Sequence, residues 1–149
     1  MRKSLIAVAF AALSISGTAA LAQAGKADGG SAEDGEQVFK KCMSCHRIGP
    51  DAKNLVGPNL TGVIGRQAGT AVDFQYSELN KNAGKSGLVW TTDLIFEYLE
   101  DPTPFLKKFL TDKGKEDLAS GATKMVFKLT DEQDRKDVIA YVKTFSPAK

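Results

Sequence analysis

Apolar residues recur at helical spacing near both ends of the chain. Gly35, Phe39 and Cys42 fall at positions i, i+4 and i+7, and Ser31 before them is a good N-cap. Near the other end, a stripe of apolar side chains repeats at i, i+3, i+4 and i+7: Val138, Tyr141, Val142 and Phe145. The pattern therefore predicts one helix at each end of the domain.

Capping residues and prolines set the expected helix boundaries. Thr130 followed by Gln133 forms a T-x-x-Q capping box, which predicts that the last helix starts there. Residues 92–99 are predicted to form a short helix that ends at Asp101-Pro102, because proline disfavours helical backbone in the residue before it. We expect residues 105–110 to form another helix.

The centre of the chain lacks these patterns. Residues 53–87 are rich in Gly and Asn, and their few apolar positions follow neither the helical nor the strand period. A stretch of this length without secondary structure is uncommon in an ordinary packed domain, so something other than backbone pairing must order it. Strand signals are weak throughout, which favours an all-α fold over an α/β sheet.

The first segment, residues 1–22, has the features of a cleaved secretory signal peptide. It starts with Arg2 and Lys3, continues with an apolar stretch at 5–13, and ends in the cleavage motif Ala20-Leu21-Ala22. A membrane anchor is the alternative, but this stretch is shorter than the roughly 20 residues that span a bilayer. We therefore expect secretion to the periplasm.

Removing the signal peptide defines the remaining chain. A second A-x-A motif leaves open a cut after Ala24 instead of Ala22. We expect a flexible, polar N-terminal arm at 23–30 and one domain at 31–149, a length that suits a single core. Loss of two basic residues takes their number from 20 to 18, equal to the 18 acidic residues. A neutral chain gives no support for nucleic-acid binding.

The sequence Cys42-Met43-Ser44-Cys45-His46 is a C-x-x-C-H motif, the attachment signature of c-type haem. Two cysteines three residues apart, on the last turn of a helix, can reach the two vinyl groups of one porphyrin. The histidine that follows then lies under the ring and can bind the iron. The motif therefore predicts one covalently attached haem c per chain.

Three other interpretations of the two cysteines compete with this one. A structural disulfide is possible in an exported protein, but a three-residue spacing is typical of redox-active pairs. A thioredoxin-like dithiol needs a strand before the motif and a helix after it, whereas here the motif ends a helix. A Cys₂His₂ zinc site needs a second histidine, and the chain has only one.

The supply of further iron ligands is limited. His46 is the only histidine, so two histidines cannot bind one iron, and the thioether-bonded cysteines offer no thiolate. Of the three methionines, Met1 leaves with the signal peptide and Met43 lies inside the attachment loop. Met125 remains as the sixth ligand, with a core side chain as the alternative role. A His/Met pair raises the potential and closes both axial positions, which favours electron transfer over oxygen chemistry.

With these residues identified, the chain resembles a bacterial class I cytochrome c of the cytochrome c2 type. The resemblance covers nearly all of residues 32–145 and is carried by specific motifs: Gly35 and Phe39 before Cys42-x-x-Cys45-His46, Gly57-Pro58-Asn59-Leu60-x-Gly62, Gly65-Arg66-x-Ala68-Gly69, Phe74-x-Tyr76-Ser77, Asn80-Lys81, Trp90, Tyr98-Leu99, Asp101-Pro102, Thr123-Lys124-Met125-x-Phe127 and Ala140-Tyr141-Val142. It implies a small fold of helices and long loops around one haem, which would supply the core that the central segment lacks.

The resemblance also implies roles for individual residues. The Pro58 carbonyl is expected to accept a hydrogen bond from His46 and fix its orientation. Three side chains are expected to hydrogen-bond the haem propionates: Arg66, Tyr76 and Trp90. A polar network is expected near the Met125 sulfur: Asn80, Tyr98 and Thr123. Leu60, Leu99 and Phe127 would line the haem faces, and Gly35 would let the terminal helices cross, with Phe39 and Tyr141 packed at the crossing.

Two segments depart from compact members of this family. The residues from 103 to 122 form an insertion of the kind found in larger bacterial cytochromes c2, with its surplus around 111–121. A shorter insertion lies around 83–87, before Trp90. Neither insertion removes a ligand, but the longer one could change solvent access near Met125.

Charge placement and the resemblance together predict the partners. Acidic residues gather near the chain ends, whereas lysines flank the haem motifs: Lys41, Lys53, Lys107, Lys108, Lys124 and Lys128. A positive face would steer transient docking onto acidic redox partners, although the lysines could also be merely solvated. The resemblance implies a cytochrome bc complex as donor and a terminal oxidase, photosynthetic reaction centre or periplasmic reductase as acceptor.

The expected function is that of a soluble, monomeric one-electron carrier, without stable membrane insertion and without catalytic residues. Two rival hypotheses belong to other classes. In a haem enzyme or gas sensor, Met125 would dissociate to open the iron. In a thiol oxidoreductase, the cysteines would carry no haem and would react with alkylating agents.

Overall fold

The computed structural model describes residues 25–146, and in this range the backbone forms five α-helices and one short 3₁₀ helix. In chain order they are α1 (Ala32–Phe39), α2 (Glu78–Lys85), α3 (Thr92–Glu100), α4 (Pro102–Asp112), η1 (Glu116–Leu118) and α5 (Glu132–Lys143). Within this range there is no strand, only an isolated bridge between Gln67 and Val89. The predicted all-α architecture is confirmed. The signal peptide predicted at 1–22 lies outside the described residues.

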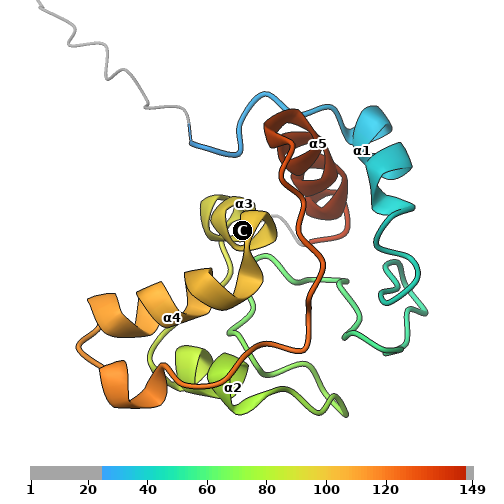
Figure 1. The fold of residues 1–149 in the computed structure, drawn as a ribbon. Helices are drawn as coiled ribbons and strands as arrows, with labels where there is room; N and C mark the ends of the chain where they lie inside the picture. Colours follow the sequence, from blue (N-terminus) through green and yellow to red (C-terminus); the bar gives the residue numbers. More distant parts are fainter. Residues whose placement is uncertain (1–24, 147–149) are drawn as a thin grey trace, which may run out of the picture.

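The first and last helices pack against each other, as predicted, and form the most extensive helix–helix contact (Figure 1). Gly35 makes the close crossing possible: a Cβ at this position would lie 2.0 Å from the Asp137 carbonyl oxygen. Phe39 packs on Tyr141 beside this point, with ring centroids 5.3 Å apart. The Ser31 side chain caps α1 by accepting from the Asp34 N–H. The crossing is thus made by the residues to which the family resemblance assigns it.

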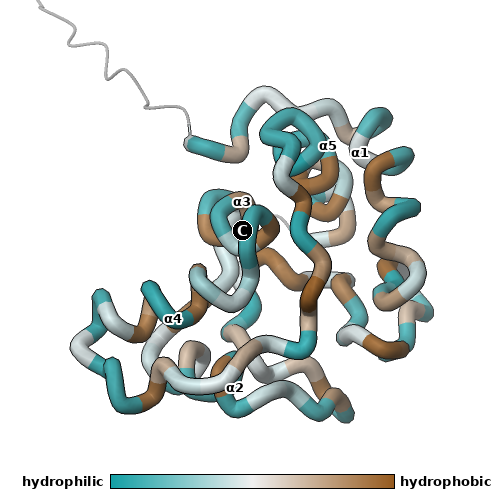
Figure 2. Tube along the Cα trace, in the orientation of Figure 1, coloured by the Kyte–Doolittle hydropathy of each residue, from teal (hydrophilic) through white to brown (hydrophobic). Residues whose placement is uncertain are grey.

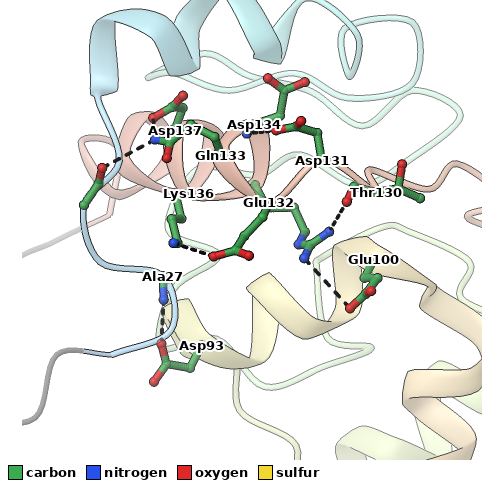
Figure 3. A network of polar contacts seen from close by, with 12 residues as sticks. Ala27, Asp93, Glu100, Thr130, Asp131, Glu132, Gln133, Asp134, Lys136 and Asp137 are labelled. Carbon is green, nitrogen blue, oxygen red and sulfur yellow. Dashed lines mark hydrogen bonds and ion pairs between the residues drawn. The ribbon is translucent and has the colours of Figure 1, made fainter.

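The start of α5 differs from the prediction. Asp131, not Thr130, is the N-cap, and its carboxylate accepts from the Asp134 N–H at 2.8 Å. Gln133 does not reach back to a cap; its amide donates instead to Asp137 at 2.9 Å (Figure 3). An aspartate caps as well as a threonine and adds a negative charge near the positive helix end, so the later position is favoured.

The central segment also contains more structure than expected, because α2 lies inside the stretch predicted to be irregular. Ser77 caps α2 by accepting from the Asn80 N–H, and the helix buries Leu79, Asn80 and Ala83. Two of these buried side chains are small or polar, so the helix lacks an apolar stripe of the usual kind. The remainder, from 53 to 77, forms turns and bends as predicted.

Helices α3 and α4 meet at a sharp junction. The helix predicted at 92–99 is confirmed and extends to Glu100, whereas the one predicted at 105–110 is longer and starts at Pro102. Asp101 has extended backbone (φ −154°, ψ 98°), ends α3 and precedes α4. Pro102 has no backbone N–H, so it cannot continue α3. The first turn of a helix needs no such N–H, so the same proline can start α4.

The described part of the N-terminal arm, residues 25–30, packs on the helices rather than extending away. The Ala27 N–H donates to Asp93 in α3 at 3.1 Å (Figure 3), and the Ala27 side chain is buried. Next to the arm, the Ser31 N–H donates to Asp137 in α5 at 2.8 Å. The sequence predicts a flexible arm at 23–30, but these contacts hold its described part against α3 and α5.

Long connections complete the molecule. The connection from α4 to α5 crosses the front of the structure and carries a hydrophobic stretch in its middle (Figure 2). None of the helices described between residues 25 and 146 has the length and apolar character needed to cross a membrane.

Candidate functional site

A cavity of about 300 Å³ lies between the α1–α5 pair and the connections. Protein interiors contain few voids larger than a water molecule, so a cavity of this size indicates a bound group. All eleven residues singled out as cofactor or metal ligands line it: Cys42, Cys45, His46, Pro58, Arg66, Tyr76, Asn80, Trp90, Tyr98, Thr123 and Met125. The structure thus brings together residues spread over more than half of the chain.

The C-x-x-C-H motif forms a turn at one wall of the cavity. The sequence pattern places Cys42 on the last turn of α1, but the helix ends at Phe39 and Cys42 follows it. Turn hydrogen bonds continue beyond the helix: Cys42 N–H donates to Phe39 at 2.8 Å, and His46 N–H donates to Cys42 at 2.9 Å. The two cysteines form no disulfide. This compact turn presents two cysteines and one histidine to the same cavity.

Burial raises the pKa of the Cys42 thiol to about 11. A thiol that attacks disulfides or substrates at neutral pH has its pKa lowered, because the thiolate is the nucleophile. Cys42 has the opposite shift. The environment therefore does not resemble that of a redox-active dithiol.

The orientation of His46 is fixed by its neighbours. Its Nδ1 lies 2.7 Å from the Pro58 carbonyl oxygen, which can only accept, so Nδ1 carries the proton and Nε2 keeps its lone pair. Gly57 allows this approach, since a Cβ there would lie 2.4 Å from the imidazole Cε1. Burial lowers the pKa of His46, and the Pro58 hydrogen bond offsets part of the shift. The imidazole is thus held neutral with one nitrogen available to a metal.

Met125 lies on a segment without helix or strand between η1 and α5. The Met125 N–H donates to the Thr123 hydroxyl at 3.3 Å, and the side chain lines the same cavity as His46. Farther along the segment, the Leu129 N–H donates to the Leu99 carbonyl at 2.8 Å. The Leu129 bond ties the methionine segment to the end of α3.

Three polar residues that line the cavity have no acidic partner among residues 25–146. The Arg66 guanidinium donates to the Asn59 carbonyl at 2.9 Å and to the Thr61 carbonyl at 3.5 Å. Burial lowers the pKa of Arg66 and raises that of Tyr76. The Trp90 ring is buried against Tyr98, with centroids 4.9 Å apart. A part-buried cation beside two polar aromatic side chains suits a group that brings its own negative charge.

A second polar cluster lies close to the Met125 segment. The Tyr98 hydroxyl is 3.5 Å from the Thr123 hydroxyl, and Asn80 accepts from the Ser77 hydroxyl at 2.8 Å. Burial raises the pKa of the Tyr98 phenol, while hydrogen bonds from Thr123 and Asn80 act in the opposite direction. The phenol therefore stays neutral at physiological pH and acts as a fixed dipole.

Apolar side chains make up most of the remaining lining. Leu60, Leu99 and Phe127 lie there as expected. The sequence analysis did not identify further lining residues: Val63, Ile95, Val138, Ile139 and Val142. Their signal is present in part, since Ile95 and Leu99 lie four residues apart in α3, as do Val138 and Val142 in α5.

These residues fit a haem. The cavity combines an apolar interior, paired cysteines beside an imidazole with a free nitrogen, a thioether, and a part-buried guanidinium at its edge. A haem carries a group that is complementary to each of these features: two vinyl groups, a metal centre, an apolar ring and two carboxylates. The structural features of the site thus agree with the interpretation of its sequence motif.

Comparisons with known proteins bear on the family. The family model for cytochrome c matches residues 32–146. Cytochrome c2 iso-1 of Rhodospirillum centenum is 68% identical over 112 residues, which cover 75% of this chain and 93% of the relative. Cytochrome c2 of Rhodopseudomonas palustris is 60% identical over 132 residues, covering 89% of this chain and 93% of the relative.

Solved structures agree with these matches. The structure of cytochrome c2 from Rhodospirillum centenum superimposes with a TM-score of 0.79 at 65% identity, covering 79% of this chain and all of that one. The C-x-x-C-H turn, the cavity and these matches lead to one conclusion. The chain belongs to the cytochrome c family, as a class I protein of the cytochrome c2 type that transports electrons on a covalently bound c-type haem.

Proposed function

We propose that this protein is a periplasmic one-electron carrier whose haem iron is bound by His46 and Met125. The observation that carries the proposal is that the only imidazole of the chain and the Met125 side chain line one cavity. Haem iron with a His/Met ligand pair supplies a reversible one-electron couple at raised potential. The residues of the chain would attach the haem, orient its ligands and balance its charge.

Cys42, Cys45 and His46 define the attachment wall. The two cysteine sulfurs would bond to the haem, which holds it without relying on the iron ligands. The Pro58 carbonyl accepts from His46 Nδ1, so Nε2 would face the iron and the ring could not rotate. A hydrogen-bonded imidazole is also a stronger electron donor than a free one, which supports the oxidised metal.

The polar residues would balance the charge of the propionates. Arg66 offers a permanent positive charge and, together with Tyr76 and Trp90, hydrogen-bond donors at the cavity. On the methionine side, Thr123 binds the Met125 N–H and contacts Tyr98, with Asn80 close by. These contacts would keep the sulfur in a fixed position in both oxidation states. Small rearrangement between the two states favours fast electron transfer.

We infer that the protein is not an enzyme, because a His/Met pair leaves no open position on the iron. Leu60, Leu99 and Phe127 would exclude water from the ring. The rival haem enzyme or sensor would need Met125 to leave, whereas hydrogen bonds from Thr123 to Thr103 and from Leu129 to Leu99 hold its segment on both sides. Electron transfer across the cavity edge remains as the reaction that this geometry supports.

Partners would dock at the face where the cavity opens. Lys41 and Lys124 line the cavity, and the nearby Val56 and Val126 are 75% and 86% exposed. Lys41 pairs with Asp134, whereas the Lys124 ammonium donates to the Gln75 carbonyl and so keeps its full charge. A small apolar centre with lysines suits brief contacts with acidic redox complexes. The proposed donor is a cytochrome bc complex, and the acceptor a terminal oxidase, reaction centre or periplasmic reductase.

The lysine contribution is tested by electron-transfer kinetics. Lys124→Gln removes a charge that has no acidic partner among residues 25–146, and Lys108→Gln removes a lysine paired with Asp112 as a control. We expect Lys124→Gln to slow association with an isolated cytochrome bc complex at low salt and to flatten the salt dependence. Equal slowing by both variants would contradict this docking face.

The ligand assignment is tested by Met125→Ala, with Met43→Ala as a control because Met43 is 46% exposed. In purified ferric protein, Met125→Ala should abolish the methionine–iron charge-transfer band and lower the midpoint potential by about a few tenths of a volt. Met43→Ala should leave both unchanged. An unaltered spectrum in Met125→Ala would refute the His/Met pair, and a colourless wild-type protein would support the thiol oxidoreductase instead.

A further inference from the structure

The junction between α3 and α4 contacts the Met125 segment at three successive points. Besides the bond from Leu129 N–H to the Leu99 carbonyl, the Lys128 ammonium lies 2.5 Å from the Asp101 carboxylate. The third contact runs from the Thr123 N–H to the Thr103 hydroxyl at 3.3 Å. Alternate junction residues thus hold both ends of the segment that carries Met125.

The third contact also joins the two ends of the long insertion. Thr103 is its first residue, and Thr123 directly follows its last. The insertion itself packs on the protein, since Leu118 contacts the core and its carbonyl accepts from Asn82 in α2. The hydrogen bond between Thr103 and Thr123 therefore closes the base of the insertion, beside the methionine segment.

Side-chain packing stabilises the middle of the Met125 segment only weakly. Thr123 and Leu129 are 7% and 5% exposed, but Val126 is 86% and Phe127 39% exposed. Segments with few buried contacts open locally at low free-energy cost. The hydrogen bonds at the two ends therefore contribute a large share of what keeps this segment closed.

We propose that Thr103 is a positioning residue for Met125. Its hydroxyl accepts from the Thr123 N–H, and the Thr123 hydroxyl accepts from the Met125 N–H in turn. This relay links the start of α4 to the backbone of Met125 and keeps the thioether at the cavity. The inference rests on the proposed role of Met125 as an iron ligand.

The test compares three variants of the haem-loaded protein. Thr103→Val keeps the shape but removes the hydroxyl, Thr103→Ser keeps the hydroxyl, and Thr111→Val is a control on an exposed position of the same helix. One measurement is the rate at which imidazole binds ferric iron, which requires Met125 to leave. The other is amide hydrogen exchange at Thr123 and Met125, which does not depend on iron ligation.

Losing one hydrogen bond should make local opening roughly three- to tenfold more frequent. Thr103→Val should therefore speed both imidazole binding and amide exchange by that factor, while Thr103→Ser and Thr111→Val should behave as wild type. Wild-type rates in Thr103→Val would overturn the proposal, as would equal acceleration in Thr103→Ser, which would assign the effect to the methyl group. Failure of the ligand assignment looks different, because wild-type ferric protein would then lack the methionine–iron band.

Discussion

The two halves of the cavity are built in different ways. On one side, α1 and α5 pack directly through Gly35, Phe39, Tyr141 and the buried Val138, with side chains filling the space between backbones. On the other side, residues 53–77 form turns and bends, residues 119–131 run without helix or strand, and parts of both segments line the cavity. The helix half packs on itself as well as lining the cavity with Val138, Ile139 and Val142, whereas the loop half has no such helix pairing of its own.

The two halves differ in the source of their stability. Burial of apolar surface stabilises a helix pair whether or not a ligand is bound. Leu60 and Phe127 of the loops line the cavity, so the burial of these side chains depends on the cofactor. The stability of the helix pair should therefore depend mainly on side-chain packing, and the stability of the loops should depend on whether haem is bound.

The largest expected effect comes from removing the attachment. In the double variant Cys42→Ala/Cys45→Ala, the porphyrin has no covalent bond, and we expect haem content to fall close to zero after purification. Amides in the loops should lose protection from exchange, and those at the α1–α5 crossing should keep more of it. A pyridine haemochrome spectrum and hydrogen exchange measure the two parts. Uniform loss across both halves would contradict the division.

A single methyl group tests the helix half. Gly35→Ala would place a Cβ 2.0 Å from the Asp137 carbonyl oxygen, a backbone contact that neither helix can relieve without moving. We expect unfolding free energy to fall by about 3 kcal/mol or more, measured by denaturant unfolding of the holoprotein.

Gly114→Ala is the matched control for this variant. Gly114 has φ +66° and open space around it, so only backbone strain of about 1 kcal/mol should appear. If the two alanine variants lost equal stability, the close crossing would not be what Gly35 provides.

The sequence predicts the elements that have a clear local pattern and misses those that do not. The terminal helices are predictable from their periodic patterns, and their crossing at Gly35 from the family resemblance. Helix α2 escapes prediction because its buried face consists of Leu79, Asn80, Ala83 and Gly84, and only the first of these is a large apolar residue. The cap at Asp131 was missed because Thr130 satisfies the same local pattern one residue earlier.

The site is more predictable than the fold around it. The spacing of Cys42, Cys45 and His46 is determined by the chemistry of attachment, so it can be identified in sequence without any structural information. Its distant members were placed from a family resemblance, and the structure brings them to one cavity. The Thr103 contact could not be predicted, because it depends on how the insertion folds back on its own start.

Polar contacts allow a smaller test of the helix half. Buried Asp137 accepts from the Ser31 N–H at 2.8 Å and from the Gln133 amide at 2.9 Å. Asp137→Ala leaves these donors without their acceptor, so we expect a loss of about 2 kcal/mol in unfolding free energy. The midpoint potential should stay at the wild-type value, because neither Ser31 nor Asp137 lines the cavity. A shift in potential would show that the two halves are coupled.

The smallest expected effect concerns the loop half. Asn54 accepts from the Asn59 N–H at 2.9 Å and donates to the Val72 carbonyl at 2.8 Å, linking two turns at the edge of the cavity. Asn54→Ala should lower unfolding free energy by about 1 kcal/mol, since both partners lie near solvent and can bond to water instead. Hydrogen exchange should quicken at Asn59 and leave the α1–α5 crossing unchanged. Because the haem holds these turns from the inside, the same substitution should matter more when the haem is absent, and a measured loss that did not depend on haem would show that the loops order themselves.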